Sequence, residues 1–207
     1  MRVVLASSNS GKLRELAALL EPLGWALVSQ RELGIESPPE TGATFLENAL
    51  IKARHAARAA HLPALADDSG IEVDALGGAP GVWSARYAGE RATDGENLAK
   101  LLEALRGVAP ERRTARYRCV IAYVGSADDP RPILGEGSWE GRIAAAPRGN
   151  GGFGYDPIFI PLHTGTSGGA PRTAAELAPR EKAAGSHRAR ALAAFRSHLE
   201  PAGPRNP

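Results

Sequence analysis

Two adjacent carboxylates have the clearest capacity for chemistry in this chain, within Ala64-Leu65-Ala66-Asp67-Asp68-Ser69-Gly70. The short apolar run before them favours a buried strand that ends where the acids begin. Ligands usually bind at strand ends in open α/β sheets, and neighbouring carboxylates repel, so we expect a compensating cation, a metal or a raised pKa. A plain turn, with Asx hydrogen bonds and a glycine, is the simpler interpretation of the same four residue types.

A second candidate is Ser7-Ser8-Asn9-Ser10-Gly11-Lys12, which follows a predicted strand over residues 2–6. Apolar residues then recur at helical spacing from Leu13 to Leu20, so the segment joins a strand to a helix N-terminus. Free backbone N–H groups at such a junction suit a phosphate, and Lys12 adds a full charge. The usual phosphate loop differs, because its first glycine is absent here and Leu13 replaces a hydroxyl residue. Simple helix capping by a serine or asparagine is the alternative.

A helix predicted over residues 44–61 begins with Thr44 and Glu47, whose spacing is typical of a capping box. Glu40 lies just before this helix and Lys52 lies two turns inside it. A helix packed beside the strand would bring both side chains near the paired acids. The chain has only four lysines, which favours a specific need for each, although chance explains this as well. Most helix lysines are exposed, so a solvated Lys52 is the alternative.

A glycine-rich loop over residues 149–157 carries two aromatic residues, Phe153 and Tyr155. Glycines let a backbone approach a ligand closely, and an embedded ring such as Phe153 is suited to stacking on a base. The alternative is a flexible bend whose two rings pack inward.

The C-terminal region, residues 174–199, is predicted to be helical with a break near Gly185. Ser186-His187-Arg188 then stands at a helix start, four residues after Lys182, although a lone histidine there is usually a surface residue. The remaining predicted elements are a strand over 25–29, a helix over 93–105, and a hairpin of strands 116–124 and 133–145.

The composition describes an ordinary globular protein of 207 residues, 43% hydrophobic and 23% charged, enough for one substantial core or two small ones. A net charge of +2 without a basic stripe argues against a nucleic-acid partner. Cys119, the single cysteine, lies in an apolar run and is expected in the core. The sequence has no apolar run of about 20 residues and no signal-peptide pattern, so we expect a cytoplasmic protein without membrane contact.

Together these segments resemble the inosine/xanthosine triphosphate pyrophosphatase family, which clears deaminated purine nucleotides. The resemblance runs over about residues 1–199, with motifs in the same order and at close spacing. It implies an α/β fold of the ITPase/Maf type, with a long mixed sheet flanked by helices and two lobes around a central cleft. It also implies hydrolysis of ITP, dITP and XTP to the monophosphate and pyrophosphate, and a homodimer. The sequence shows no linker between domains, so we expect a single domain over 1–199 with a disordered tail over 200–207. The matching segments are S-S-N-S-G-K at 7–12, Glu40 to Gly42, Asn48-Ala49, Lys52-Ala53, Asp67 to Gly70, residues 77–86, residues 153–157, and Ser186 to Arg188.

The resemblance also implies roles for individual residues. Asp68 is the expected proton acceptor that activates water, Glu40 and Asp68 are the expected Mg²⁺ ligands, and Lys52 is expected to assist catalysis. A sparse set of one or two carboxylates is typical of Mg²⁺, which also binds substrate phosphates. The expected substrate-binding residues are Ser7, Ser8, Asn9, Ser10, Gly11, Lys12, Ser69, Phe153, Gly154, Tyr155, Asp156, Lys182, His187 and Arg188.

Two local departures from the family pattern concern the base side of the site. Residues 162–171 form a longer loop than is usual, and Arg172 stands where a lysine is common. Two rival interpretations are a Maf-type pyrophosphatase for other nucleotides and a nucleotide-sensing module without turnover. Intact Glu40, Asp67 and Asp68 argue against the sensing module.

Overall fold

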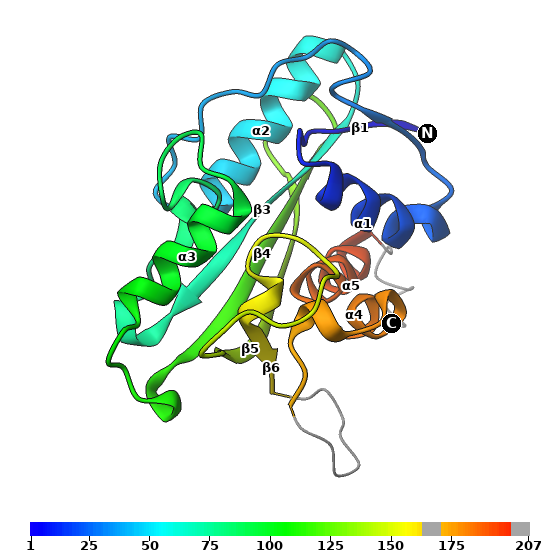
Figure 1. The fold of residues 1–207 in the computed structure, drawn as a ribbon. Coiled ribbons are helices and arrows are strands. Elements are labelled where there is room, and N and C mark those ends of the chain that lie inside the picture. Colours follow the sequence, from blue (N-terminus) through cyan, green and yellow to red (C-terminus); the bar gives the residue numbers. More distant parts are fainter. Residues whose placement is uncertain (163–170, 200–207) are drawn as a thin grey trace, which may run out of the picture. The chain divides into compact units, whose positions relative to one another are not determined.

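A computed structural model describes residues 1–162 and 171–199, so the predicted loop over 162–171 and the predicted tail lie almost wholly outside the described residues. Its sheet has six strands in the order β2-β1-β3-β4-β5-β6 (Figure 1). β1 pairs in parallel with β2 and β3, whereas β5 and β6 are antiparallel, which confirms the predicted mixed sheet. The strands are β1 Arg2–Leu5, β2 Ala26–Ser29, β3 Ala64–Val73, β4 Thr114–Val124, β5 Ile133–Ile143 and β6 Phe159–Pro161.

The helices follow the predicted periodicity closely. They are α1 Ser10–Leu20, α2 Phe45–Ala60, α3 Asp94–Ala104, α4 Pro179–Gly185 and α5 His187–Leu199, with short 3₁₀ segments between them. Side-chain caps define the starts of the longer helices, because Thr44 Oγ1 accepts from Glu47 N at 3.2 Å and Thr93 forms a full capping box with Glu96. Across residues 1–162 and 171–199, none of the helices is long and apolar enough to cross a membrane.

The chain divides into two compact units. Unit 1 comprises 1–68, 119–137 and 187–207, of which 1–68, 119–137 and 187–199 are described; unit 2 comprises 69–118 and 138–186, of which 163–170 are not described. The strands β3, β4 and β5 contribute residues to both units. The prediction of one domain over 1–199 stays a prediction.

The core of unit 1 lies where α1 and α5, which run side by side in Figure 1, contact the strands. Leu16 of α1 and Phe195 of α5 pack with Val3, Leu65 and Ile121 from three strands. The thiol of Cys119 is fully buried in the same cluster, as predicted, and burial raises its pKa.

Two glycines in β5 let the backbone of α5 approach the sheet of unit 1. A Cβ on Gly135 would lie 2.2 Å from Ala191 O, and one on Gly137 would lie 2.3 Å from His187 O. Because the two glycines are two residues apart in a strand, they face the same side of the sheet. The helix start that carries His187 is therefore held against a strand that has no side chains at these two positions.

Unit 2 has its own core around the ring of Phe159. Tyr117 packs on it with ring centroids 4.7 Å apart, and Trp139 with centroids 5.3 Å apart.

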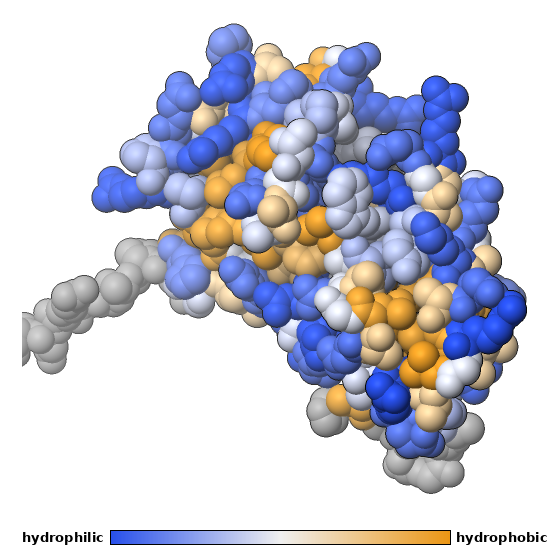
Figure 2. All heavy atoms as spheres, turned by 90° about the vertical axis from the view of Figure 1, so that its left-hand side faces the viewer, coloured by the Kyte–Doolittle hydropathy of each residue, from blue (hydrophilic) through white to orange (hydrophobic). Residues whose placement is uncertain are grey.

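Figure 2 shows a face of the molecule on which patches of hydrophobic side chains alternate with hydrophilic ones. The exposed large hydrophobic residues of the described chain are Met1, Leu33, Trp83 and Leu162.

The strand that carries the paired acids is longer than predicted. β3 runs from Ala64 to Val73, so Asp67, Asp68 and Ser69 lie inside it instead of in a turn. The prediction of a strand ending at Ala66, and the turn interpretation with it, are wrong. A strand can continue through two acids because successive side chains point to opposite faces and need not approach each other.

Candidate active site

Asp67 points to the face of the sheet that α1 and α5 cover in unit 1. Its carboxylate pairs with Lys12 Nζ at 3.2 Å and Arg188 Nε at 3.4 Å, and the residue is 1% exposed. Burial by itself raises the pKa of Asp67, but the charges of Lys12 and Arg188 outweigh burial and hold that pKa well below its usual range. Asp67 is therefore held on this face by two cations, one from α1 and one from α5.

Arg188 is itself fixed by a second acid. Its Nη1 donates to Glu15 Oε2 at 2.7 Å, and the residue is 3% exposed. Burial lowers the pKa of Arg188, but its acidic neighbours Asp67 and Glu15 raise it more. The first turn of α5 is therefore tied by charge to both β3 and α1.

Asp68 points to the opposite face, where α2 supplies its partner. Lys52 Nζ donates to Asp68 Oδ1 at 2.6 Å and to Glu40 Oε1 at 2.8 Å. Lys52 is 8% exposed, so the alternative of a solvated helix lysine is wrong. The predicted approach of Glu40 and Lys52 to the paired acids is confirmed for Asp68.

The electrostatics of this second cluster differ from those around Asp67. Burial raises the pKa of Asp68, and the attraction of Lys52 offsets this only in part. Burial lowers the pKa of Lys52, but the carboxylates of Asp68, Asp67 and Glu40 raise it more. The two neighbouring acids thus have opposite pKa shifts, with Asp68 the more basic of the pair.

Glu40 and Asp68 present two carboxylate oxygens to one cation, the ammonium of Lys52. Hard oxygen donors around a single positive charge are the ligand chemistry that Mg²⁺ prefers, so this donor set fits that ion. Over the described part of the chain, there is no group of three or more His, Cys, Asp or Glu side chains arranged to hold a metal.

The local contacts of the segment before α1 are those of a helix cap, the alternative to phosphate binding. Asn9 caps the helix, because its Oδ1 accepts from Lys12 N at 3.0 Å, and Asn9 N donates to Ser7 Oγ at 3.3 Å. Ser7 is buried and Ser8 is exposed, whereas the side chain of Ser10 lies outside what the structure describes. A role for this segment in binding phosphate stays a prediction.

In unit 2, the glycine-rich loop is organised around Asp156. Its Oδ2 accepts from Lys182 Nζ at 2.7 Å and from Phe153 N at 2.9 Å, and Lys182 Nζ lies 4.8 Å from the centroid of the Phe153 ring. Gly154 N donates to Asp94 Oδ2 at 2.7 Å, which connects the loop to the start of α3. An acid, a lysine and an aromatic ring from two distant segments thus form one cluster.

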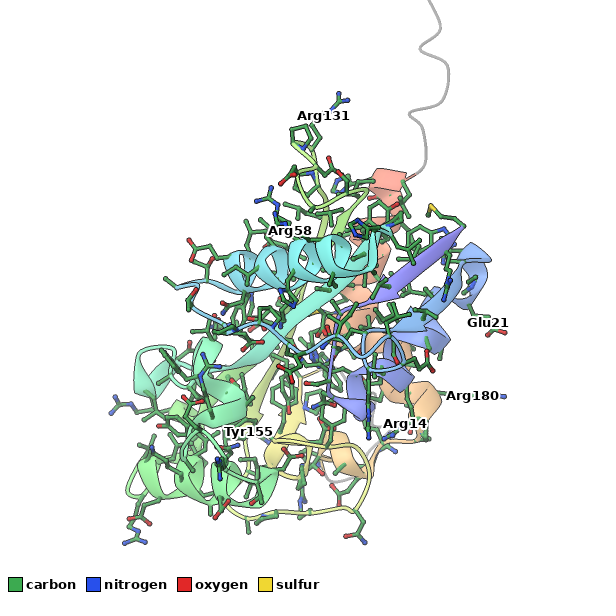
Figure 3. All side chains as sticks on the ribbon, turned by 90° about the horizontal axis from the view of Figure 1, so that it is seen from above. Arg14, Glu21, Arg58, Arg131, Tyr155 and Arg180 are labelled. Atoms are coloured by element: carbon green, nitrogen blue, oxygen red, sulfur yellow. The ribbon has the colours of Figure 1, made fainter. Side chains whose placement is uncertain are left out.

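Tyr155 belongs to the core of unit 2. It is 4% exposed, its hydroxyl donates to Ser84 O at 2.8 Å, and burial raises its pKa. Figure 3 shows Tyr155 inside the fold, whereas the labelled Arg14 and Arg180 point outward. The inward packing considered for this ring is confirmed, and its assignment to the substrate stays a prediction.

The other expected binding residues lie on or beside these elements. Ser69 follows Asp68 in β3 and is half-buried, and Gly11 is buried in the first turn of α1. His187 begins α5 and is 2% exposed, so it is a buried residue and the usual surface position of a lone histidine does not apply.

Sequence reasoning missed three residues that position the site. Glu15 lies three residues after Lys12, a spacing that places both on one helix face. Gly135 and Gly137 alternate within a strand, a pattern that marks close approach of another backbone.

Gly137→Ala is expected to lower the free energy of unfolding by about 3 kcal/mol, in the range for overpacking. The added Cβ would meet backbone atoms, His187 O at 2.3 Å and Ala191 N at 2.4 Å, which cannot rotate away. Urea denaturation measures the change. Gly95→Ala is the control, because its added Cβ meets nothing closer than Thr93 Oγ1 at 4.0 Å. Equal stability of the two variants would contradict the close approach of α5.

Comparisons with known proteins identify the family of this chain. A model of the Ham1 family matches residues 3–198. The dITP/XTP pyrophosphatases of Shigella flexneri and Escherichia coli (strain K12) are 56% and 55% identical over 191 residues, 92% of this chain and 94% of each relative. Solved structures of a HAM1 protein from Coxiella burnetii and of the Staphylococcus aureus Ham1 protein have TM-scores of 0.85 and 0.81 at 50% and 36% identity, each covering 96% of this chain and 98% of the other.

These matches confirm the resemblance and the α/β fold that it implies. They extend over the strand with the paired acids, the helix with Lys52 and the glycine-rich loop alike. A likeness that spans sequence and structure over almost the whole length leaves one assignment: the chain belongs to the Ham1 family.

Proposed function

We propose that this chain is a nucleoside triphosphate pyrophosphatase that hydrolyses deaminated purine nucleotides, ITP, dITP and XTP, to the monophosphate and pyrophosphate. Its relatives at 55–56% identity carry the name dITP/XTP pyrophosphatase. The observation that carries the proposal is the convergence of Glu40 and Asp68 on one buried cation, Lys52. Hydrolysis of a polyphosphate needs this combination of acidic ligands and positive charge.

Mg²⁺ is the proposed cofactor, with Glu40 and Asp68 as its protein ligands. When bound, it neutralises negative charge on the substrate phosphates. The chain's own contribution is to hold two carboxylate oxygens toward the same point, with Lys52 beside them. Two carboxylates completed by phosphate oxygens and water make a usual Mg²⁺ site.

Asp68 is the proposed general base. Asp68 lies beside Glu40 and Lys52, where the proposed metal and phosphates would bind. Asp67 is held on the opposite face of β3 by Lys12 and Arg188. Asp68 would orient a water and accept its proton as the water oxygen bonds to the α-phosphorus. The bond from that phosphorus to the α–β bridging oxygen breaks at the same time, and pyrophosphate leaves with its electron pair. Attack on phosphorus demands positioning and charge neutralisation more than covalent chemistry, which suits a site made of acids and lysines.

Lys12, Lys52 and the segment before α1 are proposed to bind phosphates, and the Phe153 ring is proposed to stack on the purine base. Donors directed at the purine 6-oxygen would favour deaminated bases, because the amino group of ATP would leave those donors unpaired. Lys182, whose ammonium contacts Asp156 and lies over the Phe153 ring, is proposed as one such donor. The full proposed set is Ser7, Ser8, Asn9, Ser10, Gly11, Lys12, Ser69, Phe153, Gly154, Tyr155, Asp156, Lys182, His187 and Arg188.

The proposal also covers the domain organisation, the oligomeric state and the cellular location of the protein. We infer one catalytic domain over 1–199, a homodimer and a cytoplasmic location, all from the resemblance and the sequence pattern. Size-exclusion chromatography with light scattering tests the dimer directly.

The experiment that tests the function is a turnover assay on dITP, XTP, dGTP and ATP with pyrophosphate and orthophosphate measured separately. We expect pyrophosphate from dITP and XTP in the presence of Mg²⁺, its loss after chelation by EDTA, and little product from ATP or dGTP. Orthophosphate as the primary product, or equal turnover of ATP and dITP, would contradict the proposal.

A further inference from the structure

Lys52 stands where a metal bound by Glu40 Oε1 and Asp68 Oδ1 would have to stand. Its Nζ lies 2.8 Å from Glu40 Oε1 and 2.6 Å from Asp68 Oδ1, so both carboxylates are directed at this one nitrogen. A divalent ion bound by the same two oxygens would stand beside the ammonium, and like charges at such distances repel strongly. Lys52 and the metal therefore compete for one pair of acids.

The ammonium of Lys52 can move away from Glu40 and Asp68 only if another negative charge receives it. The side chain of Lys52 is 10% exposed and that of Asp68 is 7% exposed, so bulk water solvates neither well. Removal of one partner from a buried ion pair leaves an unpaired buried charge, which is costly. The lysine therefore needs another anion to move toward before the metal can take its place, and a triphosphate brings several negative charges.

We propose that Lys52 is a place-holding cation, which occupies the metal position until the triphosphate draws it onto a phosphate. This inference rests on the proposed function, because it takes Glu40 and Asp68 as the metal ligands. It deepens that function by setting the order of events. Lys52 would keep the affinity of the nucleotide-free protein for a divalent ion low, and would release Glu40 and Asp68 when the nucleotide binds.

Lys12 provides a matched comparison within unit 1. It forms its ion pair with Asp67 at 3.2 Å, on the opposite face of β3 from Asp68. Loss of Lys12 removes the same charge from the neighbouring acid Asp67 and leaves Lys52 on Glu40 and Asp68. Comparison of the Lys52 and Lys12 variants thus separates two effects on metal affinity. One is direct occupation of the metal position, and the other is the loss of one positive charge near the acids.

The test is a titration of the nucleotide-free protein with Mn²⁺ alone, with free Mn²⁺ followed by electron paramagnetic resonance. We expect weak binding to the unmodified protein, binding about tenfold or more tighter to Lys52→Met, and less than about a threefold change in Lys12→Met. Lys52→Met/Asp68→Asn should lose the gain, because one of the two acids no longer carries charge. Circular dichroism checks folding, and Lys52→Gln is the second neutral variant if the methionine variant does not fold.

An unchanged or weaker Mn²⁺ affinity in a folded Lys52→Met or Lys52→Gln protein would overturn the proposal. Equal gains in the Lys52 and Lys12 variants would also overturn it, since general charge would then explain both. The titration contains no nucleotide and measures no turnover. A chain that cleaves dITP but shows no gain refutes the place-holding role alone, whereas a gain without dITP cleavage refutes the proposed function alone.

Discussion

Asp68→Asn is expected to lower the rate of pyrophosphate release from dITP by about 10³-fold or more while dITP still binds. The substitution keeps the size of the side chain but removes its negative charge. Asp68 needs that charge both to accept a proton and to bind the metal. Loss of a general base alone costs about 10²–10⁴-fold, and a weakened metal site adds to this. Binding should persist because the lysines and the aromatic ring proposed to hold the nucleotide remain in place.

Two measurements separate chemistry from binding for this variant. Pyrophosphate release is followed at saturating dITP and Mg²⁺, and the dissociation constant of dITP is measured by calorimetry on the inactive protein. Asp128→Asn is the control, because the Asp128 side chain is 92% exposed and pairs only at the surface with Arg58 at 3.2 Å. Turnover by Asp68→Asn within tenfold of the unmodified protein would exclude Asp68 as the base.

Arg188→Met is expected to destabilise the fold by about 3–5 kcal/mol, the usual cost of removing one partner from a buried ion pair. Arg188 is 3% exposed and neutralises Asp67, which is 1% exposed. Without the guanidinium, Asp67 loses one of its cationic partners, while Lys12 remains at 3.2 Å. Stability should fall because a buried carboxylate is then less well compensated.

Urea denaturation at neutral pH measures this loss. Arg180→Met is the matched control, because Arg180 is exposed on α4 and points outward in Figure 3. The double variant Arg188→Met/Asp67→Asn should recover part of the loss, since it removes the charge left unpaired. A midpoint for Arg188→Met equal to that of Arg180→Met would show that the pair contributes nothing to stability.

A stable Arg188→Met protein with weakened dITP binding would instead assign Arg188 to the substrate alone. The geometry connects the two roles, because Arg188 contacts Asp67, the neighbour of the proposed base in β3. Measurement of both stability and dITP affinity on the same protein separates them.

The sequence by itself determined which residues are available for chemistry and which elements carry them. Local rules suffice for this: a Thr44 cap begins α2, and strand ends and glycine turns are encoded by residue types within a few positions of each other. The regular rise of the helix from that cap then sets how far Lys52 lies from the start of α2. The same rules, together with the family motifs, predicted that Glu40, Lys52 and Asp68 would meet, and they do.

The tertiary structure alone decided what each of the two adjacent acids does. Sequence reasoning treated Asp67 and Asp68 as a repelling pair at a strand end, but β3 continues through them and directs them to opposite faces. Each face is covered by different helices, so Asp67 is neutralised by Lys12 and Arg188 while Asp68 meets Lys52. Arg188 lies 121 residues from Asp67 along the chain, and even Lys52 lies 16 residues from Asp68. Their meeting depends on packing, which local residue patterns do not specify.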